Sequence, residues 1–370
     1  MTIKPTFSQE ELDIKLERLQ RLLEERHLDA LWLRRVSSFA WATCGGGSHI
    51  NTASSEGGAS LLFTRRERYL VSNNIEIHRL EQEEGLAGQG WQPEVLPWFT
   101  PQDQVSRLVG GLALGADLEM PGAQDVSDDL AWMRARLTTP EQERFRTLGR
   151  LCASGMMQAV NAIRPGMTEL KIAGLLAEAM ESQGVQLVVN LVACDERILA
   201  FRHPLPKDRA LKRYAMLVAC GRKWGLICSL TRLLYFGQLP DALRRKAEAT
   251  ALVDAVMISA TRPGVSMGGV FQQAQQAYAS AGFPEEWHLH HQGGLAGYEP
   301  REIVAAPGTP NPVEIGQAYA WNPSITGTKS EDTILVAADG NQVLTQIDGW
   351  PLREIKIGAQ SVLRPEILEL

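Results

Sequence analysis

The first apolar pattern in the chain predicts an amphipathic helix over residues 8–26. Its leucines recur every three or four positions and so share one helical face: Leu12, Leu16, Leu19 and Leu23. Ser8 and Glu11 have the spacing of a capping box, which is typical of a helix start. The apolar stretch "DALWL" directly after this helix predicts a strand.

Short apolar segments continue this alternation to about residue 137. "GASLLFT" and "RYLVSN" flank the charged turn "RRER" and predict a hairpin. Alternating short helices and strands are typical of a small α/β domain. "TTPEQERFRTL" then joins a threonine cap, an early proline and acidic residues, which predicts a new helix. We therefore predict an N-terminal domain over 1–137 and a second domain over 138–370.

A weak internal repeat marks the second domain. Segments 163–184 and 261–282 both begin with Arg-Pro-Gly and end in glycine, at a constant offset of 98 residues. Each is preceded by a predicted helix and followed by predicted strands. Two such halves would place their hairpins face to face, with a site between them. The alternative is that Arg-Pro-Gly is ordinary punctuation between helices.

Composition narrows the classes of function. The 370-residue chain is 44% hydrophobic and 22% charged, which is ordinary for a globular protein. Its net charge is −6 and it has no basic run, so we expect neither nucleic acid nor a membrane surface as a partner. The first residues lack the apolar core of a signal peptide, and no apolar stretch approaches ~20 residues. Five scattered cysteines are typical of a reducing environment, so we expect a cytoplasmic protein.

Three segments of the second domain carry the candidate chemistry: "MLVACGRKWGLICSLTR", "HHQGGLAGYEP" and "AWNPSITGTKSED". With the small α/β domain and the two Arg-Pro-Gly segments, they resemble the creatinase/aminopeptidase P family over nearly the whole chain. The resemblance implies an N-terminal creatinase-like α/β domain followed by an α+β pita-bread domain with a pseudo-twofold internal repeat. It also implies, for most members, a two-metal peptidase site held by two Asp, one His and two Glu.

Three of those five ligands are replaced in this chain. By resemblance, Ala219 and Ser229 stand at the two Asp positions and Asn322 stands at the first Glu position, whereas His291 and Glu331 are kept. Bridging carboxylates must neutralise about four positive charges in a two-metal site. We therefore predict no catalytic metal and no cofactor.

Cysteine is a weak substitute for the missing ligands. Cys220 and Cys228 adjoin Ala219 and Ser229 in the sequence. Because strand side chains alternate between faces, we expect both thiols to point away from the metal side and to be buried.

Loss of the metals does not exclude catalysis, because creatinase resembles a metal-free member that cleaves a C–N bond by acid/base chemistry. Its essential histidine precedes the first hairpin, and His203 in "FRHPLP" lies at about that place. We predict His203 as the acid/base. His291 and Glu331 are predicted to assist, with Glu331 fixing the tautomer of His291. The alternative for His203 is an ordinary loop residue.

Further residues are predicted to bind the substrate: Asn322, Arg301, Ser229, Arg232, Tyr298 and His290. Arg301 lies close to a creatinase arginine and could hold a carboxylate, although a surface role is the alternative. Arg232 is usually structural in the family. Tyr298 stands at the position of a second family histidine. His288 and His290 would share one side if "WHLHH" is a strand, with polar packing as the alternative.

A glycine run in the N-terminal domain, Gly45 to Gly47, lies in a loop with polar flanks. In family dimers such loops approach the partner's site, so we predict a homodimer with this loop in a shared pocket; a plain surface loop is the alternative. The leading interpretation is a metal-independent hydrolase of a C–N bond in a small-molecule substrate. A non-catalytic binding protein and a residual Xaa-Pro metallopeptidase are the alternatives.

Overall fold

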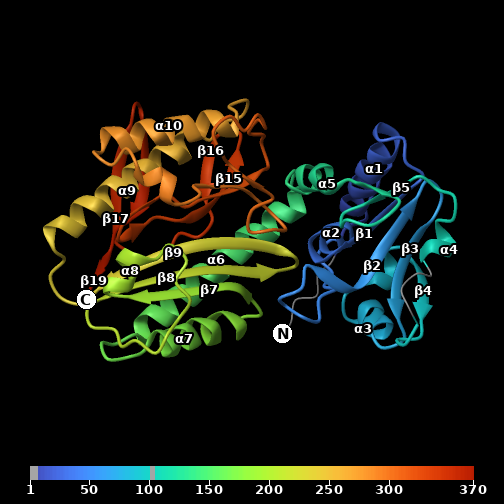
Figure 1. The fold of residues 1–370 in the computed structure, drawn as a ribbon, viewed down its shortest axis with the longest axis horizontal. Helices are drawn as coiled ribbons and strands as arrows, with labels where there is room; N and C mark the ends of the chain where they lie inside the picture. Colours follow the sequence, from blue (N-terminus) through green and yellow to red (C-terminus); the bar gives the residue numbers. More distant parts are fainter. Residues whose placement is uncertain (1–6, 101–104) are drawn as a thin grey trace. The chain divides into compact units, whose positions relative to one another are not determined.

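The computed structural model describes residues 7–100 and 105–370, and it divides into two compact units (Figure 1). The first unit is Met1–Glu141 with Trp224–Leu226, and the second is Gln142–Lys223 with Ile227–Leu370. The predicted boundary at residue 138 stays a prediction. No helix in the described ranges is both long and apolar enough to cross a membrane.

The first unit is built on a mixed six-stranded sheet, in the order β4-β3-β2-β1-β5-β6. Its strands are β1 (Ala30–Arg35), β2 (Glu56–Thr64), β3 (Arg68–Asn73), β4 (Gln92–Leu96), β5 (Leu114–Ala116) and β6 (Ala123–Asp125). Its helices are α1 (Gln9–Glu25), α2 (Val36–Ala42), α3 (Ile77–Gln82), η1 (Leu86–Gly88), α4 (Val105–Leu108) and α5 (Ser127–Arg134).

The local predictions for this unit are confirmed. The α1 helix begins after Ser8, whose hydroxyl accepts a hydrogen bond from the Glu11 backbone N–H at 3.1 Å. "DALWL" forms most of β1, and β2 and β3 pair as an antiparallel hairpin.

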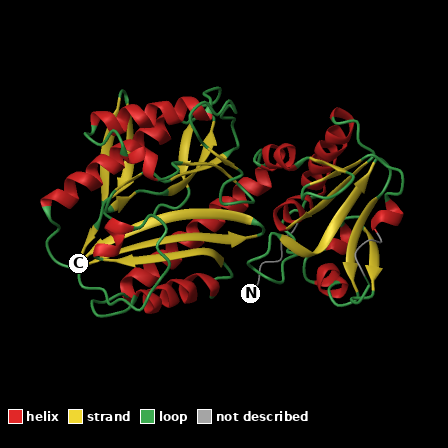
Figure 2. Ribbon diagram, in the orientation of Figure 1, coloured by secondary structure: helices red, strands yellow, loops and turns green. Residues whose placement is uncertain are grey.

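The second unit contains two two-stranded sheets and two larger sheets, which have helices against them (Figure 2). One sheet has the order β19-β9-β8-β7 and the other β11-β10-β12-β15-β16. The elements up to the middle are α6 (Thr139–Ala162), α7 (Glu169–Glu181), β7 (Gln186–Cys194), α8 (Glu196–Ala200), β8 (Tyr214–Lys223), β9 (Leu226–Tyr235), α9 (Asp241–Ala260) and α10 (Met267–Ser280). The remaining elements are η3 (Glu286–Leu289), β10 (Gly293–Ala296), β11 (Ile303–Val304), β12 (Ala318–Trp321), β13 (Ser324–Ile325), β14 (Thr328–Lys329), β15 (Asp332–Ala337), β16 (Gly340–Val343), β17 (Leu352–Ile357), β18 (Gln360–Pro365) and β19 (Leu368–Glu369).

The internal repeat predicted from Arg-Pro-Gly is confirmed. The α7 and α10 helices begin after Thr168 and Ser266, and each hydroxyl caps the backbone N–H three residues later. The preceding glycines, Gly166 and Gly264, have φ values of 89° and 87°, a conformation that glycine adopts without strain. Both pairs keep the offset of 98 residues. The unit is therefore a duplicated helix–helix–sheet arrangement.

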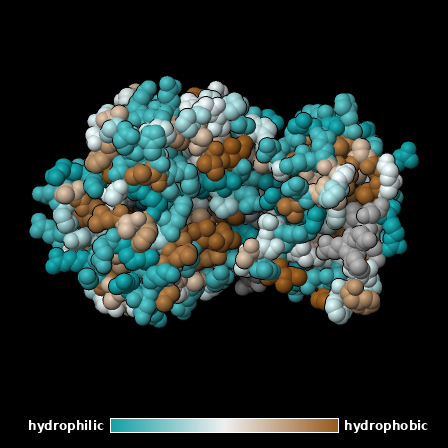
Figure 3. Space-filling model, in the orientation of Figure 1, coloured by the Kyte–Doolittle hydropathy of each residue, from teal (hydrophilic) through white to brown (hydrophobic). Residues whose placement is uncertain are grey.

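The candidate polar residues of this unit lie among buried strands. Every residue of β9 is buried, and the β7–β9 sheet packs apolar side chains such as Leu191, Met216 and Leu233 into one cluster. On the face seen in Figure 3, brown apolar residues interrupt a mainly polar surface. The two sheets are joined by an antiparallel bridge between Thr231 and Glu331, and this bridge is where the candidate residues gather.

Candidate active site

The hairpin of β8 and β9 brings Cys220 against Ser229. Trp224 and Gly225 form a two-residue turn, with φ of 53° and 77°. Counting back from this turn puts Cys220 opposite Ser229, and Cys220 Sγ lies 3.2 Å from Ser229 Oγ. The residue that faces Ser229 is therefore Cys220 and not Ala219. The prediction that the Cys220 thiol points away from the site is wrong, because the short turn shifts the register by one residue.

Glu331 lies at the junction of the two sheets, and both its carboxylate oxygens are occupied. Arg301 donates to Oε1 at 3.0 Å, while Lys329 at 3.0 Å and the Thr231 hydroxyl at 2.6 Å contact Oε2. The Glu331 and Lys329 side chains are 2% and 4% exposed. Burial alone raises the pKa of Glu331, but Lys329 and Arg301 outweigh it and lower this pKa to about 2. Glu331 is therefore ionised and held by two cations.

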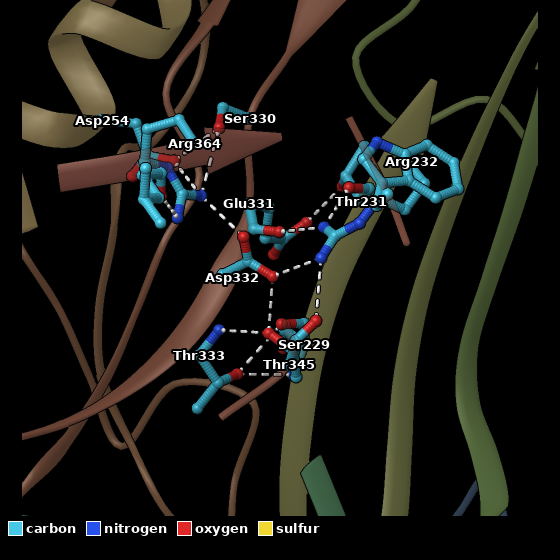
Figure 4. A network of polar contacts seen from close by, with 12 residues as sticks. Ser229, Thr231, Arg232, Asp254, Ser330, Glu331, Asp332, Thr333, Thr345 and Arg364 are labelled. Carbon is cyan, nitrogen blue, oxygen red and sulfur yellow. Dashed lines mark hydrogen bonds and ion pairs between the residues drawn. The ribbon is translucent and has the colours of Figure 1, made fainter. Parts of the chain in front are cut away.

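A second buried network lies directly behind Glu331 (Figure 4). The Asp332 carboxylate accepts from Arg232 at 2.8 Å and from Arg364 at 2.7 Å, and Arg364 also pairs with Asp254 at 2.5 Å. Arg232 donates in addition to the Thr345 carbonyl at 2.8 Å. The structure thus places the Arg232 guanidinium in the framework that fixes the strand after Glu331. These contacts support a structural role for Arg232, and its role in binding the substrate stays a prediction.

Three histidines converge beside this junction. The Nε2 atoms of His203 and His290 lie 3.0 Å apart, and the His203 and His291 ring centroids are 5.6 Å apart. His290 is buried, whereas His203 and His291 are exposed on one side. The structure therefore brings together the predicted His203, His290 and His291. It does not join His291 to Glu331 by any hydrogen bond described, so the predicted role of Glu331 in fixing its tautomer is wrong.

The local environment keeps all three imidazoles neutral. Burial lowers the pKa of His290 to about 2 and the pKa of His291 to about 4, and Lys329 acts in the same direction on both. Burial and then Lys329 also lower the pKa of His203. Neutral imidazoles can accept a proton, and they are also the form that binds metals.

In the described part of the chain, the group of His, Cys, Asp or Glu side chains placed to hold a metal ion is this same trio. The ligand atoms of His203, His290 and His291 all lie within 4.8 Å of one another. Lys329 is a positively charged neighbour of all three rings. Its charge opposes the binding of a cation there.

The other predicted substrate-binding residues line the same junction. Asn322 follows β12, is 2% exposed, and its Oδ1 atom is buried without a hydrogen-bond partner. Ser229 Oγ lies 3.2 Å from a guanidinium nitrogen of Arg301, and Arg301 Nε is also buried without a partner. Tyr298 is buried near the start of the Arg301 loop. Asn322, Ser229 and Arg301 therefore share one site.

His288 separates from this group. Residues Glu286–Leu289 form the 3-10 helix η3 and not a strand, so His288 and His290 do not share a side as the alternation suggested. The His288 ring stacks on Trp287 with centroids 3.6 Å apart and is exposed. The alternating polar pattern predicted a strand for this segment, but the chain forms a 3-10 helix, so side chains two positions apart do not lie on one face.

Two residues were missed at the sequence level, Lys329 and Cys220. Lys329 lies two positions before Glu331, so an extended backbone would put both side chains on one face. That spacing could have indicated a Lys–Glu pair. Cys220 could have been found from the Trp-Gly turn, because the length of a two-residue turn fixes hairpin register.

The glycine loop of the first unit is partly held in place. The Gly47 backbone N–H donates to the Glu84 carboxylate at 2.7 Å, and Arg34 pairs with Glu56 at the end of the loop. Ile50 at its tip is 64% exposed. A contribution of this loop to a partner's site stays a prediction.

Together, the creatinase-like α/β unit and the duplicated unit with its polar junction define a protein of the pita-bread class. A family model described as metallopeptidase family M24 matches residues 143–338. The chain belongs to this family.

Relatives extend the likeness to nearly the whole chain. An uncharacterized peptidase of Staphylococcus saprophyticus is 26% identical over 363 residues, which cover 90% of this chain and 99% of that protein. The agropine synthesis cyclase of Rhizobium rhizogenes is 23% identical over 302 residues, covering 70% of this chain and 76% of that protein. The crystal structure of a prolidase from Pyrococcus horikoshii superposes with a TM-score of 0.78 at 18% identity, covering 90% and 99% of the two chains. The likeness to this prolidase shows a shared fold and nothing further.

Proposed function

We propose that this protein is a hydrolase that cleaves a C–N bond of amide or amidine type in a small molecule, without a catalytic metal. The observation that carries the proposal is the hydrogen-bonded pair of neutral histidines, His203 and His290, beside a Glu331 carboxylate already occupied by cations. A positioned imidazole is an effective general base near neutral pH. Membership of a peptidase family supports hydrolysis, and the residues of the site suggest how it proceeds.

The donor set does not fit the two metal ions that the family implies. Such ions need carboxylates to bridge and neutralise them, yet Cys220, Ser229 and Asn322 are neutral, the Asp332 carboxylate is already paired with two arginines, and the junction itself carries Glu331. Arg301 and Lys329 contact both oxygens of that carboxylate. A divalent ion would have to displace a buried cation to reach Glu331, so we route no step through a metal.

His203 is the proposed acid/base. Of the two tautomer arrangements that satisfy its bond to His290, we assign the one in which His203 Nε2–H donates, because this leaves His203 Nδ1 free to accept a proton. His290 Nδ1–H then points toward Ser324 Oγ at 3.5 Å. A base on the exposed side of the cluster can remove a proton from water and return it to the leaving nitrogen. His291 and Asn322 are the proposed groups that orient water and substrate.

The test is a turnover screen with matched histidine variants. Purified protein, treated with a chelator, is incubated with a library of N-acyl amino acids, dipeptides and amidines, and released amine is measured by mass spectrometry. His203→Ala should lower turnover by ~10²–10⁴-fold, the usual contribution of a general acid/base. His288→Ala is the control, because it removes an exposed histidine outside the cluster.

Two results would overturn the proposal. Turnover that disappears with the chelator and returns with Mn, Co or Zn would show a metal-dependent enzyme. Elemental analysis of His290→Ala would then reveal whether the three histidines hold that metal. Equal turnover in His203→Ala and wild type would remove His203 from the mechanism.

Ring closure is a second candidate function, favoured by the likeness to agropine synthesis cyclase across 70% of this chain. The same histidine pair could move the protons of an intramolecular acyl transfer. Mass spectrometry separates the two outcomes, because hydrolysis adds one water to the substrate and ring closure with loss of water removes one.

A further inference from the structure

The segment that carries His203 has little regular structure of its own to hold it in place. Residues 201–213, all of which the structure describes, connect α8 to β8 and form a single isolated bridge, at Ala210. His203 is exposed, and its neighbours Phe201 and Leu205 are 50% and 62% exposed. A catalytic side chain must keep its position to within about 0.5 Å, which a loop alone does not provide. The position of His203 therefore depends on contacts that this segment makes with other elements.

Two carboxylates anchor the part of the segment that follows His203. The buried Glu169 carboxylate accepts a hydrogen bond from the Lys207 backbone N–H at 2.9 Å. The Asp195 carboxylate accepts from the three backbone N–H groups of Lys212 to Tyr214 at 2.8–3.0 Å. Glu169 lies in α7 and Asp195 directly after β7, so both hold the segment against the first half of the duplicated unit.

Arg202 links the earlier part of the segment to the second half of the unit. Its guanidinium lies 2.5 Å from the Glu286 carboxylate in η3 and donates to the Thr326 hydroxyl at 3.0 Å. The same Glu286 oxygen accepts from the Thr326 backbone N–H at 2.9 Å and from its hydroxyl at 3.0 Å. The Arg202 and Glu286 side chains are 19% and 17% exposed, so water screens this ion pair less than a surface pair.

The ion pair and the histidine contact join the same segments. Arg202 directly precedes His203, and η3 begins at Glu286 and ends directly before His290. The Nε2 atoms of His203 and His290 lie 3.0 Å apart. The hairpin of β13 and β14 takes part at both points, because its turn contacts Glu286 and its Ser324 Oγ lies 3.5 Å from His290 Nδ1. A change in the ion pair therefore moves the two segments that carry the imidazoles.

We propose that Arg202 and Glu286 are positioning residues that hold the His203 imidazole against His290. Arg202 fixes the backbone directly before His203, and Glu286 fixes η3, which leads to His290. Both residues act through His203 and not on the substrate. The inference rests on the proposed function in one respect, because it assigns how the proposed acid/base is held. The position of His203 can be measured without turnover.

The first experiment measures how fast diethyl pyrocarbonate modifies His203, with the modified residues identified by mass spectrometry. Arg202→Met and Glu286→Gln each remove one charge of the pair at similar size. Each should raise the modification rate of His203 roughly fivefold to tenfold, the shift expected for one charge-assisted hydrogen bond that is partly screened. The double variant should be no faster than either single variant, because the contact is lost only once.

Two matched controls separate this contact from a general change of charge. Arg209→Met removes an exposed arginine from the same segment, and Glu285→Gln removes the neighbour of Glu286, whose side chain is 85% exposed. Both should keep the wild-type rate at His203. His288 should also keep its rate in Arg202→Met, which excludes a general loosening of the unit. If Arg202→Met does not fold by circular dichroism, Thr326→Val replaces it.

The second experiment uses any substrate that the turnover screen provides. Glu286→Gln should lower kcat by up to ~10²-fold with KM near that of wild type, because a misplaced base slows chemistry more than binding. In the His203→Ala background the same substitution should have no further effect on kcat, since a residue that acts through His203 has nothing left to position.

The outcomes separate this inference from the proposed function. An unchanged modification rate of His203 in Arg202→Met and Glu286→Gln would overturn the positioning pair, and so would an equal loss of kcat from Glu286→Gln with and without His203. Faster modification without turnover of any library member would support the pair and leave the hydrolase proposal without support. Turnover that depends on His203, with unchanged modification rates in both variants, would support the hydrolase and overturn the pair.

Discussion

The strongest prediction for stability concerns Glu331→Gln. The substitution keeps the size of the side chain and removes its charge. Three hydrogen bonds to the carboxylate, from Arg301, Lys329 and Thr231, are then weakened at once, and two buried cations lose their partner. Gln keeps one oxygen as an acceptor, and its amide group would face at least one of the cations.

The size of the effect follows from burial. Removing one partner of a buried ion pair typically costs about 3–5 kcal/mol, because the remaining charge stays away from water. In a unit of this size, each kcal/mol lowers the melting temperature by about 2–4 °C. We therefore expect the transition of the second unit to fall by about 6–20 °C.

Glu248→Gln is the control, because Glu248 also pairs with an arginine, Arg353, at 2.8 Å but is 41% exposed. Exposed pairs contribute about 0–1 kcal/mol. Calorimetry and urea denaturation would compare wild type with both variants. If Glu331→Gln is destabilised no more than Glu248→Gln, then the Lys329–Glu331–Arg301 cluster does not act as a buried ion-pair network, and the reasoning from its burial fails.

Stability should fall as pH drops below about 6.5, because the pKa values of His290 and His291 are lowered to about 2 and 4 and the unfolded chain therefore takes up protons first. The slope approaches about 1.4 kcal/mol per pH unit for the buried His290 and is smaller for His291, which is exposed and screened by water. The variant His290→Gln should flatten the slope in denaturation measured across pH 4–7. Replacing Cys220 and Ser229 by Asp and Asn322 by Glu should not create a stoichiometric Mn site while Lys329 remains, as electron paramagnetic resonance would detect. The protein should be a homodimer with the Gly45–Gly47 loop near the partner's site, so light scattering that gives a monomer at micromolar concentration would contradict this prediction.

Much of the architecture follows from local chemistry. The helix start after Ser8, the β2–β3 hairpin and the repeated caps at Thr168 and Ser266 are each confirmed. These features depend on residues close in sequence, namely cap hydroxyls, glycine in left-handed backbone and apolar periodicity. The family resemblance rests on the same kind of evidence, because the spacing of residues within a motif can be recognised in the sequence without knowledge of their contacts.

The chemistry of the site was decided by tertiary structure. The sequence gives no sign that the Glu331 carboxylate is already paired. In the structure it accepts hydrogen bonds from Arg301 and Thr231, which lie 30 and 100 residues away in the sequence. A one-residue shift in a hairpin places a thiol where alanine was expected, because the turn sets which side chains meet. The sequence by itself determined the elements and their order, and it predicted that three of the family's metal-binding carboxylates are replaced. Only the packed structure decided which charges meet, because the free energy of a buried charge depends on neighbours brought together by folding.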